Sequence, residues 1–67
     1  MDEFIEYLEA IRKEKGLNKT QFAKLIGVKL PSYSRFLNGE RKVTSNFKVT
    51  VFNNLKEKQL EIAKFLK

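Results

Sequence analysis

Apolar residues recur every three or four positions at the start of the chain, which is the spacing of one face of an α-helix. Acidic residues stand at the beginning of this segment and basic residues at its end, as the helix dipole favours. Gly16 ends the segment, because glycine readily adopts the left-handed conformation that often follows a helix. The pattern predicts a first helix over residues 2–15. Its apolar stripe consists of Phe4, Ile5, Leu8 and Ile11.

A second helix, over residues 19–26, is predicted from capping signals at both of its ends. Asn18 occupies the N-cap position, and Gln21 stands three residues further on, which is the spacing of a capping box. Gly27 ends this helix after two turns. A third helix is predicted over residues 30–37. It has a proline in its first turn, where backbone N–H groups lack helical partners anyway, and an Asn-Gly pair at its end.

The last third of the chain has a weaker helical pattern. Thr44 or Ser45 can cap a fourth helix that carries Phe47 and Val51. Its KVTVF stretch alternates and is rich in β-branched residues, so a short strand is an alternative, although the chain offers no second strand to pair with it. An Asn-Asn pair then predicts a break, and a fifth helix is expected over residues 55–66. The pattern as a whole predicts an all-α fold with about five short helices.

Length and charge add to this picture. The 67 residues are enough for one domain, residues 1–67. The net charge of +6 is uneven, since residues 1–14 carry five acids and two bases, whereas residues 15–54 carry eight bases and one acid. A basic middle is typical of proteins that bind polyanions, but basic surfaces also keep proteins in solution. Charge alone does not distinguish these two interpretations.

Composition narrows the possible chemistry. The chain contains no His and no Cys, so it lacks the commonest metal ligand, the commonest general base and any thiolate site. It also lacks a phosphate-binding glycine loop and an evident pair of catalytic carboxylates. We therefore expect no enzyme, no metal, no cofactor and no small-molecule ligand. The acidic N-terminus and the absence of a long apolar run predict neither a signal peptide nor a membrane span, and thus a cytoplasmic protein.

The second and third predicted helices have the features of a helix-turn-helix. Ala23 is small at the point where the two helices would cross, and Gly27 allows a tight turn. Polar residues of the third helix, Ser32, Ser34 and Arg35, would point away from the core. The apolar wedge between the helices would consist of Phe22, Ile26, Val28, Tyr33 and Phe36.

The stretch LNKTQFAKLIGVKLPSYSRFLNGERK resembles the helix-turn-helix of the Cro/CI-type phage repressor family, also called the XRE family. The resemblance covers residues 4–43 well and implies a lambda-repressor-like domain with its helix-turn-helix at about residues 18–38. It also implies a repressor of phage or mobile-element type that binds double-stranded operator DNA, generally as a homodimer on a palindromic site. The matching residues are Leu17, Asn18, Gln21, Ala23, Gly27, Val28, Ser34, Arg35, Asn38 and Gly39.

The resemblance also implies which residues contact DNA. Leu30 and Pro31 would touch thymine methyl groups, and Arg35 would bind guanine O6 and N7. Lys29 replaces the Ser or Thr that often caps the third helix in this family, and Tyr33 replaces a smaller Ile or Val. The expected base-reading residues are Lys29, Leu30, Pro31, Ser34 and Arg35. The expected DNA-backbone contacts are Lys19, Ser32, Asn38, Arg41 and Lys42.

Several of these residues also have simpler interpretations. Leu30 could belong to the core, Arg35 could pair with Glu40, and Tyr33 is better suited to the core than to stacking on DNA. The fifth helix has more apolar residues than one buried stripe needs, so it could form a dimer seam, or close the core and fray. The same fold could also be a protein-interaction module of antirepressor or antitoxin type. The dimer candidates are Leu60, Ile62, Phe65 and Leu66.

Overall fold

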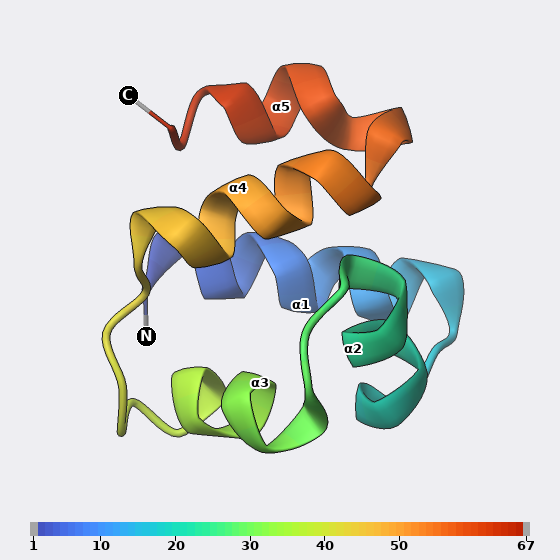
Figure 1. Ribbon diagram of the computed structural model, residues 1–67. Helices are drawn as coiled ribbons and strands as arrows, with labels where there is room; N and C mark the ends of the chain where they lie inside the picture. The colour runs from blue at the N-terminus through green and yellow to red at the C-terminus, as the bar shows by residue number, and fades with distance from the viewer. Residues whose placement is uncertain (1, 67) are drawn as a thin grey trace.

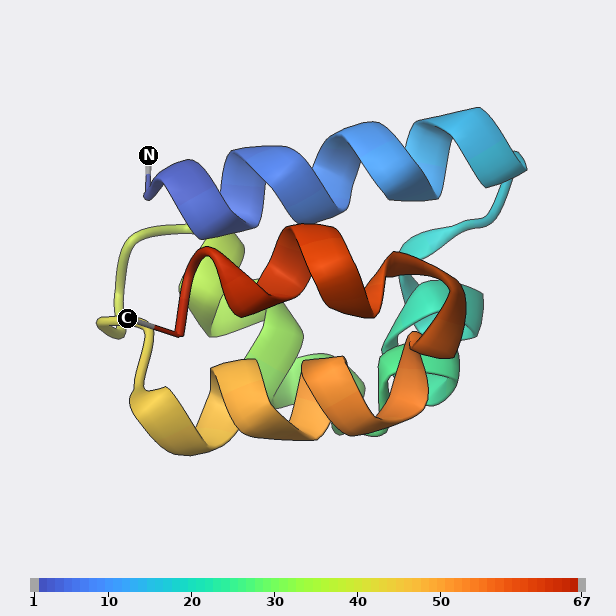
Figure 2. The same ribbon diagram turned by 90° about the horizontal axis from the view of Figure 1, so that it is seen from above.

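The computed structural model describes residues 2–66, which form helices and connecting turns without any strand. The all-α prediction is therefore confirmed. In Figure 1, α4 and α5 lie above α1, and α2 and α3 lie below it; the view from above in Figure 2 places α5 over the gap between α1 and α4. The helices are α1 (Glu3–Lys15), α2 (Lys19–Ile26), α3 (Leu30–Leu37), α4 (Ser45–Asn54) and α5 (Gln59–Ala63), and a 3₁₀ turn, η1 (Lys56–Lys58), precedes α5.

The capping residues act as the sequence predicts. Asp2, which was expected inside the first helix, instead precedes α1 as its N-cap, and its carboxylate accepts the Phe4 N–H at 2.7 Å. Both bonds of the capping box of α2 are present, since Asn18 Oδ1 accepts the Gln21 N–H at 2.8 Å and Gln21 Oε1 accepts the Asn18 N–H at 3.0 Å. Gly16 adopts the left-handed conformation with φ of 68°. These local signals explain why the predicted bounds of α2 and α3 are confirmed and those of α1 differ by one residue.

The fourth segment is a helix, so the strand alternative is wrong. Thr44 Oγ1 accepts the Phe47 N–H at 3.1 Å and caps α4. Phe47 and Val51 lie one helical turn apart and are both buried, whereas Val49 between them keeps 45% of its surface exposed. A strand would place all three side chains on the same face. The core therefore selects the helical period over the β-propensity of the KVTVF stretch.

The expected break at the Asn-Asn pair is also wrong. Asn54 belongs to α4, and its side-chain Nδ2 donates to the Thr50 carbonyl at 2.7 Å. The chain turns at Leu55 instead, where the backbone leaves the helical region (φ −102°, ψ 70°) and the side chain enters the core with 2% of its surface exposed. The expected helix over residues 55–66 is therefore split into η1 and the short α5.

The core lies between α1, α4 and the apolar sides of the other helices. Phe4 links several of them, since its ring centroid is 5.1 Å from that of Phe65 and 5.8 Å from that of Phe47. The Phe47 ring is in turn 4.3 Å from that of Phe36 on α3. The apolar sides of α2 and α3 are thus part of the main core, and their opposite sides face outward. The core residues are Phe4, Ile5, Leu8, Ile11, Phe22, Ala23, Ile26, Tyr33, Phe36, Phe47, Val51, Leu55 and Ile62.

Candidate nucleic-acid interface

A glycine turn sets the angle between α2 and α3. Gly27 has φ of 81°, and its N–H donates to carbonyls of the last turn of α2. The next N–H, of Val28, donates to the Ala23 carbonyl at 2.9 Å. A Cβ atom at Gly27 would lie 2.5 Å from Nδ2 of Asn54, so a side chain here would displace Asn54. Glycine thus permits both the left-handed turn and the close approach of the end of α4.

The predicted wedge between α2 and α3 is confirmed. Ala23 is 1% exposed, and the Phe22 and Tyr33 rings meet edge to face with centroids 5.7 Å apart. Val28 is half-buried and packs against the same cluster. Tyr33 is completely buried, which confirms that it belongs to the core. The two helices are therefore held from behind by core contacts, which leaves the opposite side of α3 available to a partner.

The outward side of α3 carries most of the expected base-reading residues. Lys29, Leu30, Pro31 and Arg35 are exposed, and Ser34 is half-buried. Leu30 keeps 36% of its surface exposed and lies outside the core cluster, so it is not the core residue of the simpler interpretation. Lys29 stands at the N-cap position without a side-chain capping bond. The start of α3 therefore presents a lysine beside an apolar Leu-Pro tip.

The charges of this side are not neutralised within the part of the chain that the structure describes. The ion pairs found among residues 2–66 join Arg12 to Glu9 and Lys15 to Glu57, so Arg35 does not pair with Glu40. Glu40 instead accepts a hydrogen bond from the Asn38 side chain at 3.2 Å. The exposed bases outside these pairs include Lys19, Lys24, Lys29, Arg35, Arg41 and Lys42.

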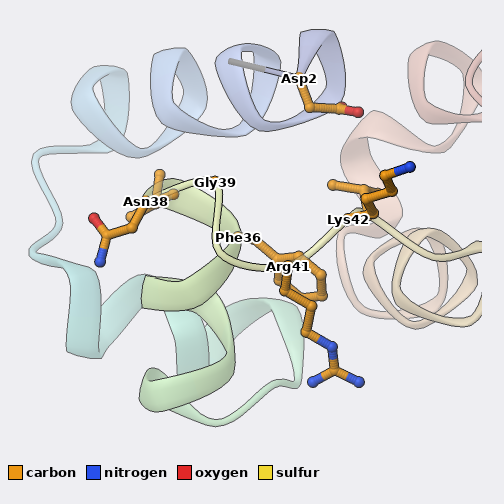
Figure 3. Close-up of a pocket in the computed structure, with 8 residues that line it drawn as sticks. Asp2, Phe36, Asn38, Gly39, Arg41 and Lys42 are labelled. Carbon is orange, nitrogen blue, oxygen red and sulfur yellow. The ribbon is translucent and has the colours of Figure 1, made fainter.

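An open hollow lies beside the end of α3 (Figure 3), lined by Asp2, by residues 36–39 and by residues 41–43. The Asp2 carboxylate is already engaged as the cap of α1. The Arg41 guanidinium carbon lies 5.6 Å from the centre of the Phe36 ring, and the guanidinium projects outward. The loop after α3 therefore presents two exposed bases, Arg41 and Lys42, one of which is steadied by an aromatic ring.

The expected backbone-contacting residues come from three segments on one side of the molecule. The first turn of α2 and the whole of α3 lie along the lower side in Figure 1, and the loop after α3 begins there and rises along the left edge to α4. Lys19 and Asn38 are exposed, like the two bases of the loop, whereas Ser32 is half-buried. Three exposed bases, Lys19, Arg41 and Lys42, therefore flank the outward side of α3. We call them the basic strip.

The four dimer candidates divide into two pairs. Leu60 is 89% exposed and Leu66 is 39% exposed. Ile62 is completely buried, and Phe65 packs its ring against Phe4 and Tyr7. Ile62 has no surface to offer a second copy, so the expectation is corrected for this residue. The reason is that α5 packs on α4, which places Ile62 in the core cluster.

A partly buried polar network joins α1 to α3, and no pattern in the sequence predicted it. The Tyr33 hydroxyl donates to Glu9 Oε2 at 2.6 Å, and Arg12 pairs with the same carboxylate. The hydrogen bonds from Arg12 hold the pKa of Glu9 below its usual value despite burial, and those from Tyr33 and the charge of Lys19 act in the same direction. Burial, reinforced by Glu9, raises the pKa of the Tyr33 hydroxyl, which stays protonated. The one feature of the sequence that could have indicated this network is Tyr33 itself, which stands where the family that the chain resembles usually has Ile or Val.

Among residues 2–66, no cluster of three or more potential metal ligands is found. No helix in this range has the length and hydrophobicity needed to cross a membrane. The sequence model of a family described as helix-turn-helix matches residues 8–46, more than half of the chain. No similar curated protein and no similar solved structure was found.

Proposed function

The chain belongs to the Cro/CI-type, or XRE-type, helix-turn-helix family of DNA-binding transcription regulators, and we propose that it is a repressor that binds a palindromic operator as a homodimer. The observation that carries the proposal is the outward side of α3, which combines the exposed Leu30-Pro31 tip with Arg35, a base that forms no ion pair among residues 2–66. In this family's geometry, the second helix of the motif lies in the major groove and reads base edges.

Each base-reading residue has a chemical target. The fork of N–H donors on Arg35 matches O6 and N7 of guanine, and a contact of this kind contributes about 1–3 kcal/mol of discrimination. Leu30 and Pro31 offer no hydrogen bond, and the apolar group of the major groove is the thymine methyl. Lys29 and Ser34 lie beside them and can bond to neighbouring bases. The expected half-site therefore contains a guanine next to one or more thymines.

The basic strip supplies contacts that do not depend on sequence. Lys19 at the start of α2 and Arg41 and Lys42 after α3 would bind phosphates on either side of the groove. Ser32 and Asn38 carry groups that can bond to phosphate oxygens. These contacts would fix the register of α3 in the groove, which direct reading of bases requires.

The size of the domain suits a dimer on adjacent half-sites. The molecule measures 25 × 25 × 18 Å, and half-sites of this geometry lie about 34–36 Å apart on one face of DNA. Two copies therefore fit side by side. Leu60 and Leu66 are the exposed apolar residues of the C-terminal segment that could join them. On the operator, the phosphate contacts of each copy would stabilise the dimer further, in addition to the contact between the two copies.

The proposed function is tested by selecting bound duplexes from a random DNA pool and titrating the winners at two salt concentrations. We expect a palindrome with a guanine and thymines in each half, bound far more tightly than a scrambled duplex. Equal, weak binding to every duplex, lost as salt rises, would mean that the basic strip binds DNA but α3 does not read it.

Arg35 should control recognition of one base pair. Replacing it with alanine is expected to weaken binding to each half-site by roughly 5- to 150-fold, the equivalent of about 1–3 kcal/mol for each guanine contact. Arg35→Lys keeps the charge but loses the fork, so we expect it to recover little of the loss. Fluorescence titration against the operator and against duplexes changed at the guanine would measure both effects. Full recovery by lysine would show that Arg35 binds a phosphate instead.

The exposed apolar tip also favours a second candidate function, a module that binds another protein. Leu25, Leu30 and Pro31 are all exposed on α2 and α3. A variant with Arg35→Ala and Arg41→Ala would separate the two functions. This variant should no longer repress transcription of the target gene if the chain acts on DNA. It should still regulate that gene if the apolar tip binds a protein.

A further inference from the structure

Tyr33 connects the base-reading helix to the opposite side of the core. Its side chain is completely buried, and its hydroxyl reaches Glu9 on α1, 24 residues earlier in the chain, at 2.6 Å. Tyr33 stands two residues after Pro31 and two before Arg35, so it lies at the centre of the proposed reading surface but on its inner side. Its position therefore affects every base-reading residue of α3.

Glu9 is a rigid anchor for this hydroxyl. Arg12 holds both of its carboxylate oxygens, with Nε 2.9 Å from Oε2 and Nη2 2.9 Å from Oε1. The remaining nitrogen of Arg12, Nη1, donates to the Leu17 carbonyl at 2.9 Å, immediately before the cap of α2. One network of hydrogen bonds therefore fixes α1, the start of α2 and the middle of α3 relative to one another.

The chemistry of this link differs from that of the apolar packing around it. Apolar contacts vary slowly when one helix slides or rotates on another, whereas a short bond to a charged oxygen weakens steeply with distance and angle. A shift of α3 would leave the buried Tyr33 hydroxyl without its acceptor, which is costly, whereas the Glu9 carboxylate would keep its bonds from Arg12. A smaller apolar residue at position 33 would provide no such restraint.

We propose that Glu9 and Tyr33 are positioning residues that fix the rotation and depth of α3 and thereby the sequence specificity of DNA binding. This inference rests on the proposed function. Neither residue needs to touch DNA, because Glu9 acts through the Tyr33 hydroxyl and Tyr33 acts through the backbone of α3. The network should therefore affect discrimination between sequences more than it affects binding to phosphates, which depends on flexible surface bases.

The chain offers a matched control. Tyr7 also donates from its hydroxyl to a glutamate, Glu61, at 3.0 Å, but this pair joins α1 to α5 and leaves α3 untouched. Tyr33→Phe and Tyr7→Phe therefore remove the same group from the same kind of bond. Each variant would be titrated with the selected operator and with a scrambled duplex, at a temperature where thermal unfolding shows all proteins folded.

We expect Tyr33→Phe to reduce the ratio of operator to scrambled affinity by about three- to tenfold, with little change in scrambled binding. Tyr7→Phe should leave the ratio unchanged. Equal ratios for the two variants would overturn the inference, as would a loss in Tyr33→Phe that affects both duplexes alike.

If the wild-type protein binds all DNA sequences equally, that result refutes the proposed function and not the positioning role of Tyr33. A second measurement then tests the positioning role by itself. Residual dipolar couplings of backbone amides report the angle between α1 and α3 in the DNA-free protein. Tyr33→Phe should change this angle and Tyr7→Phe should not. An unchanged angle in Tyr33→Phe would show that the hydrogen bond holds nothing in place.

Discussion

Replacing Leu8 with alanine is expected to unfold much of the protein at room temperature. Leu8 lies in the middle of α1 and has no exposed surface. Truncating a buried leucine costs about 2–5 kcal/mol, because apolar contacts are lost and a cavity remains. A domain of this size has a core that rarely supplies more than about 3–5 kcal/mol of net stability. The loss is therefore comparable to the whole free energy of unfolding.

Helical circular dichroism during urea and thermal unfolding would measure this effect. Leu60→Ala is the matched control, since the same atoms are removed from a side chain that is 89% exposed. In dilute solution the control should change the free energy of unfolding by less than about 0.5 kcal/mol. Similar losses for the two variants would contradict the arrangement of the core, because Leu8 would then be no more buried than Leu60.

Rising salt concentration should weaken DNA binding steeply. The two bases of the loop after α3 should account for a fixed share of the slope of log affinity against log salt. If Lys19, Arg41 and Lys42 each neutralise a phosphate, a dimer makes about six such contacts, and binding should fall by roughly 10³ between 50 and 200 mM salt. Arg41→Ala with Lys42→Ala should reduce the slope of log affinity against log salt by about 1 per residue in each subunit. Titrations at four or more salt concentrations would give these slopes.

Lys13→Ala with Lys64→Ala is the control for this experiment. It removes the same charge from exposed positions on α1 and after α5, outside the basic strip. The control should lower the overall affinity slightly and leave the slope nearly unchanged. An equal change of slope in both double variants would mean that DNA senses only the net charge. Loss of the Arg41 contact with Phe36 should cost at most about 1 kcal/mol of stability, so the variant should remain folded.

Local signals in the sequence were sufficient for the helix-turn-helix. The Asn18 cap, the Gly27 turn and the proline at the start of α3 each act within a few residues of where they stand, so the bounds of α2 and α3 could be read from the chain. The end of α4 could not be predicted from local signals in this way. The backbone leaves the helical region at Leu55, whose side chain belongs to the core cluster, and two asparagines that look like a breaker continue the helix instead.

The candidate site shows the same division. Helical spacing predicts that Tyr33 and Phe36 face the core while Arg35 faces outward, and burial agrees. The partner of the Tyr33 hydroxyl was beyond such reasoning, because Glu9 is 24 residues away and looks like one more surface acid of α1. Spacing can show which side chains are buried, but it cannot show which buried polar groups meet.

The division of α3 into an inner and an outer side has an evolutionary consequence. The residues that hold the helix in the core, Tyr33 and Phe36, are distinct from the exposed residues that would read bases. If α3 reads bases as proposed, substitutions at Leu30, Pro31 or Arg35 would change the preferred operator with little loss of stability. A lineage of such proteins can acquire new binding sites in small, tolerated steps. The inner residues are under the opposite constraint, since a change there would alter the fold and the reading of every base together.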